Sequence, residues 1–78
     1  MISRNDLTQK LSNLKKFQFL GYVTEDGLGN HIVRLRVLEF ANKNFAYENQ
    51  IFDFVIIDSA RGLRAVNQER GIIFTKLE

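Results

Sequence analysis

The fold of this chain is decided by the segment HIVRLRVLEF, residues 31–40, together with IFDFVIID, residues 51–58. In both segments the side chains alternate with a period of two, a pattern that is typical of β-strands. One face of the first strand would hold Val33, Leu35 and Val37. The other face would hold Ile32, Arg34, Arg36, Leu38 and Phe40.

The flanking sequence extends this pattern into a sheet of about five strands. They are expected at residues 17–24, 31–40, 45–58 (with a break near 48–50), 63–67 and 72–77. The first of these strands should carry Phe17, Phe19 and Val23 on one face and Leu20 and Tyr22 on the other. Short segments rich in turn-forming residues separate the strands, at 25–30, 41–44, 59–62 and 68–71. Connections this short indicate hairpins, so the sheet should be antiparallel.

Upstream of the strands, the period changes to that of a helix, which we place at residues 4–16. Leu7, Leu11 and Leu14 recur at helical spacing and form one apolar stripe. Ser3 and Asp6 have the spacing of a capping box, and Ile2 with Leu7 the spacing of a hydrophobic staple.

The sequence therefore predicts one α+β domain over residues 1–78, with an N-terminal helix and a curled antiparallel sheet. One helix followed by about five meandering strands resembles the layout of SH3-like and Sm-like small barrels. The resemblance concerns the layout alone, and a layout does not imply a function.

Both faces of the predicted sheet are largely apolar, whereas the helix can cover only part of one face. In the third strand, for example, Phe52, Phe54 and Ile56 oppose Ile51, Val55 and Ile57. Large apolar patches are seldom left in water. Either the sheet curls into a barrel or a partner covers it, and we expect self-association, with a homodimer as its simplest form.

The composition excludes several classes of site. The chain of 78 residues has no cysteine and one histidine, so it has no disulfide and a zinc site is not expected. We expect no cofactor. There is no apolar run long enough to span a membrane, and no signal-peptide pattern near Met1, so a cytoplasmic location is expected. The formal net charge of +2 is a small surplus of bases.

Few residues of the sequence are candidates for a catalytic role. His31 could act as a general base oriented by Glu25, Asp26 or Asp58, but its place beside a loop favours a solvated residue. Ser59 lacks a nucleophile elbow and is better interpreted as part of a hairpin turn with Gly62. The glycines of residues 26–30 do not form a phosphate-binding loop. We therefore expect no enzymatic activity.

Arg34 and Arg36 share one strand face with Ile32, Leu38 and Phe40, and this face is the main candidate binding surface. Three interpretations remain open: cross-strand ion pairs with Asp53, Glu39 or Glu48, a protein interface, or a platform for single-stranded nucleic acid. Arg61 and Arg64 could assist in the last case. We expect a binding or assembly module that acts through protein–protein contacts. The alternative is nucleic-acid binding.

Overall fold

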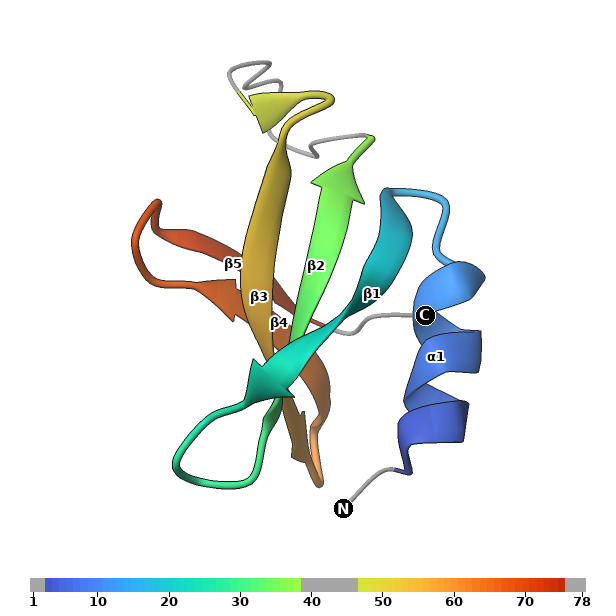
Figure 1. Ribbon diagram of the computed structural model, residues 1–78, viewed down its shortest axis with the longest axis vertical. Coiled ribbons are helices and arrows are strands. Elements are labelled where there is room, and N and C mark those ends of the chain that lie inside the picture. Colours follow the sequence, from blue (N-terminus) through green and yellow to red (C-terminus); the bar gives the residue numbers. More distant parts are fainter. Residues whose placement is uncertain (1–2, 39–46, 76–78) are drawn as a thin grey trace.

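The computed structural model describes residues 3–38 and 47–75. Helix α1 (Arg4–Ser12) is followed by strands β1 (Phe17–Glu25), β2 (His31–Val37), β3 (Ile51–Ser59), β4 (Gly62–Asn67) and β5 (Ile72–Thr75). The strands form one sheet in the order β1-β2-β3-β4-β5, and each is antiparallel to its neighbours. The expected α+β fold is confirmed. Figure 1 shows the helix beside β1 and the β4–β5 hairpin turned away from it.

The helix begins where the sequence predicts and ends earlier. The Oγ of Ser3 accepts a hydrogen bond from the N–H of Asp6 at 3.2 Å, which is the N-cap contact of a capping box. At the other end the N–H of Leu14 bonds to the carbonyl of Leu11, one residue short of helical spacing. Ser12 and Asn13 are poor helix formers, and α1 stops at Ser12 rather than at residue 16.

Two strands are shorter than expected, and some expectations concern residues that are not described. Residues 47–50 form a turn in which Asn49 adopts a φ of 64°, so β3 starts at Ile51. β2 ends at Val37, and Leu38 continues outside the strand. The expectations for Ile2, Glu39, Phe40, the turn at 41–44, residues 45–46 and residues 76–77 lie outside the described residues.

The expected faces of β1 were wrong beyond Phe19. The pairing of β1 with β2 shifts register between Phe19 and Gly21, and again between Tyr22 and Thr24. Each such bulge adds a residue to one strand and moves the following side chains to the other face. As a result Tyr22 shares the buried face with Phe17 and Phe19, while Val23 is exposed. Gly21 has a φ of 151°, a conformation that suits glycine.

The core lies between α1 and the face of the sheet that we call the inner face. Leu7 and Leu11 of the helix are fully buried there, together with Val33, Leu35, Val37 and Phe54. Phe17 of β1 lies edge-on to Phe74 of β5, with ring centroids 4.4 Å apart. The sheet thus curls until its first and last strands meet through side chains. Within the described residues, β1 and β5 do not pair, so the sheet is not closed into a barrel.

Tyr22 connects the helix to the sheet. Its hydroxyl donates to the carbonyl of Arg4 at 2.6 Å and lies 2.9 Å from the Oγ1 of Thr8. The guanidinium of Arg4 sits 4.2 Å from the centre of the Tyr22 ring, a cation–π contact. These contacts anchor the first turn of α1 over β1.

Candidate functional site

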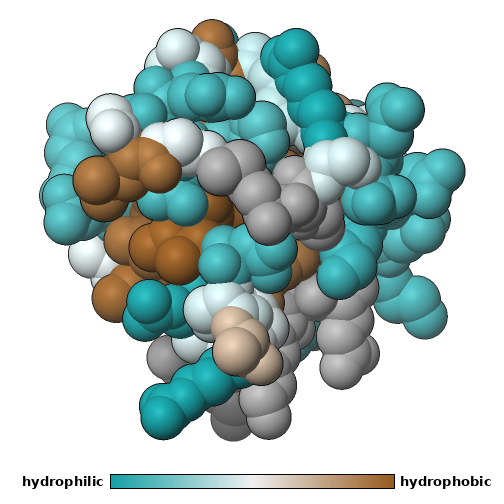
Figure 2. Space-filling model, turned by 90° about the horizontal axis from the view of Figure 1, so that it is seen from below, coloured by the Kyte–Doolittle hydropathy of each residue, from teal (hydrophilic) through white to brown (hydrophobic). Residues whose placement is uncertain are grey.

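The face of the sheet opposite α1, which we call the outer face, carries a line of apolar residues across four strands. Ile32 of β2 pairs with Val55 of β3, Val55 with Val66 of β4, and Val66 with Ile73 of β5. Paired residues of an antiparallel sheet project from the same face, so these four side chains form one row, which we call the outer row. In Figure 2 apolar surface gathers within a polar rim on the side of the molecule away from α1.

An ion pair lies next to the outer row. Arg34 and Asp53 are cross-strand partners, and their side chains make two parallel hydrogen bonds, Nε to Oδ1 at 2.8 Å and Nη2 to Oδ2 at 3.1 Å. The hydrogen bond to Asp53, reinforced by its negative charge, raises the pKa of Arg34. Cross-strand ion pairing was one of the three interpretations of Arg34, and Asp53 is confirmed as the partner. The positive charge of Arg34 is therefore neutralised locally.

Arg36 makes contacts of a different kind. Its Nε donates to the Oε1 of Gln18 at 3.2 Å, and its Nη1 donates to the carbonyl of Asn49 at 3.3 Å. Within the part of the chain that the structure describes, its guanidinium forms no salt bridge with a carboxylate. Arg36 thus uses its charge to hold the turn at residues 47–50 against the end of β2.

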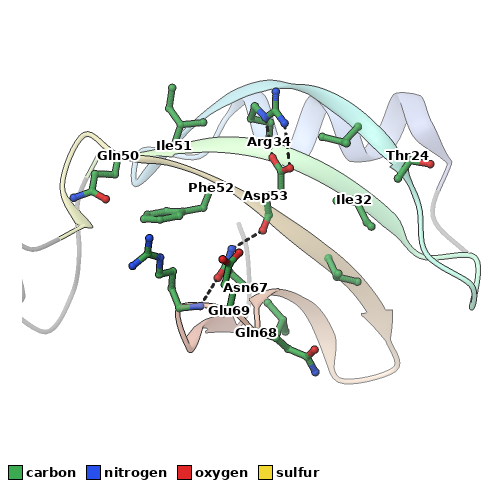
Figure 3. A pocket seen from close by; sticks show the side chains of 14 residues that line it. Thr24, Ile32, Arg34, Gln50, Ile51, Phe52, Asp53, Asn67, Gln68 and Glu69 are labelled. Atoms are coloured by element: carbon green, nitrogen blue, oxygen red, sulfur yellow. Dashed lines mark hydrogen bonds and ion pairs between the residues drawn. The ribbon is translucent and has the colours of Figure 1, made fainter.

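A groove opens between the outer face and the β4–β5 turn. Asn67 is 8% exposed; its Nδ2 donates to the carbonyl of Asp53 at 2.9 Å, and its Oδ1 accepts from the N–H of Arg70 at 2.7 Å. These two bonds hold the turn against β3 at a point where β3 and β4 no longer pair. Figure 3 shows Asn67, Gln68 and Glu69 on one side of the opening and the strands that carry Arg34 and Asp53 on the other.

The groove has a volume of about 900 Å³ and is open to solvent. Its lining combines apolar side chains of the outer face with polar ones at the rim: Ile32, Val55 and Val66 on the one hand, and Gln50, Gln68, Glu69 and Arg70 on the other. Phe52 also lines it, and its ring packs edge-on against Tyr47 at 5.6 Å. Such a mixture suits the binding of another chain better than the enclosure of a small molecule, which needs a concave and mostly closed pocket.

The six residues expected to bind are not gathered at one place. Arg34 and Arg36 share the outer face, and Leu38 is exposed just past the end of β2. Arg64 lies opposite Ile57, four residues further along β3 than the partner of Arg34, or roughly 13 Å at the rise of a strand. Arg61 lies in the β3–β4 turn, still further away. Phe40 lies outside the described residues.

His31 and Ser59, the two residues considered for catalysis, are engaged in contacts that stabilise the fold. The side chain of His31 is only 12% exposed, so it is not the solvated residue that its position suggested. Its ring packs against Tyr22 at 5.5 Å, and its Nδ1 lies 3.7 Å from a carboxylate oxygen of Glu25. The Oγ of Ser59 donates to the carbonyl of Gly62 and accepts from the N–H of Arg61, and Gly62 has a φ of 117°. Ser59 therefore belongs to a hairpin turn, as expected.

The β1–β2 loop is organised around one carboxylate. Asp26 Oδ1 accepts the N–H groups of Leu28 and Asn30, each at 2.9 Å, and Oδ2 accepts the side-chain amide of Asn30. These bonds, that from the N–H of Asn30 foremost, lower the pKa of Asp26 although desolvation opposes them. This pattern is a turn that satisfies its own backbone, and it leaves no vacant donors for a phosphate at Leu28 or Asn30.

In residues 3–38 and 47–75, no group of three or more histidine and acidic side chains is placed to hold a metal ion. No helix in those ranges has the length and hydropathy needed to cross a membrane. Comparison with protein-family models, with curated proteins and with solved structures finds no match.

Sequence reasoning missed the residues that shape the groove. The sequence places Asn67 as an ordinary polar residue at the end of the expected strand 63–67. Its side-chain amide has a role only because β3 and β4 no longer pair at this point. A polar residue on the inner face of a strand, where its neighbours Leu63 and Ala65 are buried, is the one signal that could have revealed it.

Proposed function

We propose that this chain is a non-enzymatic binding or assembly module that acts through protein–protein contacts and associates with itself. The observation that carries the proposal is the apolar outer face, in which Ile32, Val55 and Val66 of the outer row are partly exposed. Ile73 at the end of the row is 61% exposed, and Val23 and Ile51 on the same face are each 44% exposed. α1 packs against the inner face, and these three side chains remain exposed on the opposite one. An apolar surface of this kind marks an interaction site.

The distribution of charge supports a protein partner over nucleic acid. Binding to nucleic acid depends on cations that meet successive phosphates. Here Arg34 is paired with Asp53, Arg36 is committed to Gln18 and Asn49, and Arg64 lies beyond the outer row. The centres of protein interfaces, by contrast, are poor in net charge and tolerate paired arginines.

The proposal of a non-enzymatic role is supported by the structural contacts of the two side chains considered for catalysis. Ser59 is engaged by its own turn, and His31 is packed against Tyr22 away from the groove. We also propose a cytoplasmic location, with which the absence of cysteine is compatible.

Sedimentation equilibrium over a hundredfold range of protein concentration tests self-association. We expect an average mass above that of the monomer that falls on dilution, because mass action governs a reversible dimer. The double variant Val23→Ser with Ile73→Ser should remain monomeric over the same range. Leu28→Ser is the matched control, since Leu28 is 85% exposed but lies in the β1–β2 loop, off the outer face. A wild-type chain of monomer mass at every concentration would show that self-association is wrong.

A further inference from the structure

The two edges of the sheet differ in how they are protected against pairing with another strand. An edge strand exposes unpaired N–H and C=O groups, which proteins usually guard with bulges, charges, proline or a covering element. β1 has two bulges and a glycine at a φ of 151°, and α1 docks against it through Tyr22. This edge is poorly suited to add a strand.

β5 has no bulge, no charge and no proline within its four residues, Ile72–Thr75, and it pairs with β4 without a shift of register. Ile73, which is 61% exposed, lies on the outer face and ends the outer row at the free edge. This regular, uncharged edge and the apolar row therefore meet at one residue.

A twofold axis perpendicular to the sheet would make this edge complementary to itself. In antiparallel pairing, opposed residues share a face, and a symmetric β5–β5 pair opposes one residue to its own copy. Centring the pair on Ile73 or on Phe74 keeps more of the strand paired than centring it on Ile72 or Thr75. Only the first choice aligns the two outer rows, so that Ile32, Val55, Val66 and Ile73 continue directly into the same residues of the second copy. It also places Ile72 opposite Phe74 and Gly71 opposite Thr75, pairs that contain no charge.

We propose that two copies of this chain associate through antiparallel pairing of β5 with β5, with Ile73 opposite its symmetry mate, to give a continuous ten-stranded sheet. This inference rests on the self-association proposed above and specifies the element and the register. The mode is β-augmentation with an identical chain as the partner. The contact involves short strands, so the dimer should be weak and should form at high protein concentration.

Cross-linking tests the register directly, because the chain has no cysteine and any introduced thiol is the only one. Opposed Cβ atoms of an antiparallel pair lie about 4.5–5.5 Å apart, close enough for a disulfide after small adjustments. Under oxidation with diamide, which accepts the two electrons and two protons of the thiols, Ile73→Cys should form a covalent dimer on a non-reducing gel.

Two matched controls report on accidental collisions and on register. Leu28→Cys places a more exposed thiol in the β1–β2 loop and should cross-link only slowly. Thr75→Cys lies on the same strand and face, but in the proposed register its two copies are four residues apart along the strand, roughly 13 Å, so it should not cross-link. Equal rates for all three variants would overturn the proposal.

A second variant does not depend on oxidation. Ile73→Lys sets like charges opposite each other and removes the self-paired isoleucine, so it should weaken the dimer by about tenfold in sedimentation equilibrium. Its thermal melt should match the wild type, because Ile73 is largely exposed. A wild-type dimer that neither cross-links at position 73 nor weakens with Ile73→Lys would refute the β5 pairing and leave self-association standing. A wild-type monomer would refute both.

Discussion

Leu11→Ala should lower the free energy of unfolding by about 2–5 kcal/mol, the range found for truncating buried leucines. Leu11 is 0% exposed and belongs to the same buried cluster as Leu7 and Phe17. The substitution removes three carbons, whose transfer from water is worth about 0.8 kcal/mol each, and the remaining cavity adds to that cost. A domain of this length has a total stability of roughly 4–12 kcal/mol, so the variant should lose a large share of it.

Urea denaturation, followed by circular dichroism, measures the effect, with unchanged m-values as the sign that both proteins unfold in the same way. Leu28→Ala is the matched control: the same substitution on a side chain that is 85% exposed should change stability by less than about 0.5 kcal/mol. A loss below about 1 kcal/mol for Leu11→Ala would mean that α1 does not cover the inner face in solution. The placement of the core, and the distinction between inner and outer faces, would then be wrong.

The remaining predictions concern the groove and the loops. Asn67→Ala should lower the free energy of unfolding by about 1–3 kcal/mol in urea melts, because the carbonyl of Asp53 and the N–H of Arg70 lose their hydrogen-bond partner. An unchanged stability would show that this amide does not hold the turn. The folded-state pKa of Asp26 lies below its ordinary value of 3.8, so its contribution to stability is present above that pH and is lost as the pH falls through the lowered pKa. The stability difference between wild type and Asp26→Asn should therefore shrink in melts recorded below pH 3.8, and a difference that grows there would contradict the hydrogen-bonded loop. A fluorescent single-stranded oligonucleotide should not bind even at low salt; binding whose salt dependence flattens in Arg34→Ala with Arg36→Ala would favour the nucleic-acid alternative.

Much of the fold follows from sequence periodicity alone. The faces of β2 and β3 were predicted correctly because these central strands pair without register shifts, so a period of two holds along their length. The same rule failed in β1, where two bulges break the period after Phe19. Gly21 is the only trace of those bulges in the sequence, and a single glycine in a strand does not say how many residues are inserted.

The candidate site was less accessible to sequence reasoning. That Arg34 and Arg36 share a face follows from their spacing, and Asp53 was among the partners considered. Whether Arg64 joins them depends on the register of β3 with β4, which is set by the length and geometry of a turn. The groove depends in addition on the point at which β4 separates from β3. That point is set by the curvature of the whole sheet, which no short stretch of sequence reveals.

The contact between Phe17 and Phe74 has a consequence for the order in which the chain folds. Among the described strands, every hydrogen-bonded pair joins consecutive strands, so most pairings form over short loops at low entropic cost. These two rings, in contrast, are 57 residues apart in the chain (74 minus 17) and meet only after the intervening strands have curled. Truncating Phe74 should thus accelerate unfolding and leave the folding rate almost unchanged, a φ-value near zero, whereas substitutions at the β3–β4 pairing, whose strands are joined by Ala60 and Arg61 alone, should slow folding.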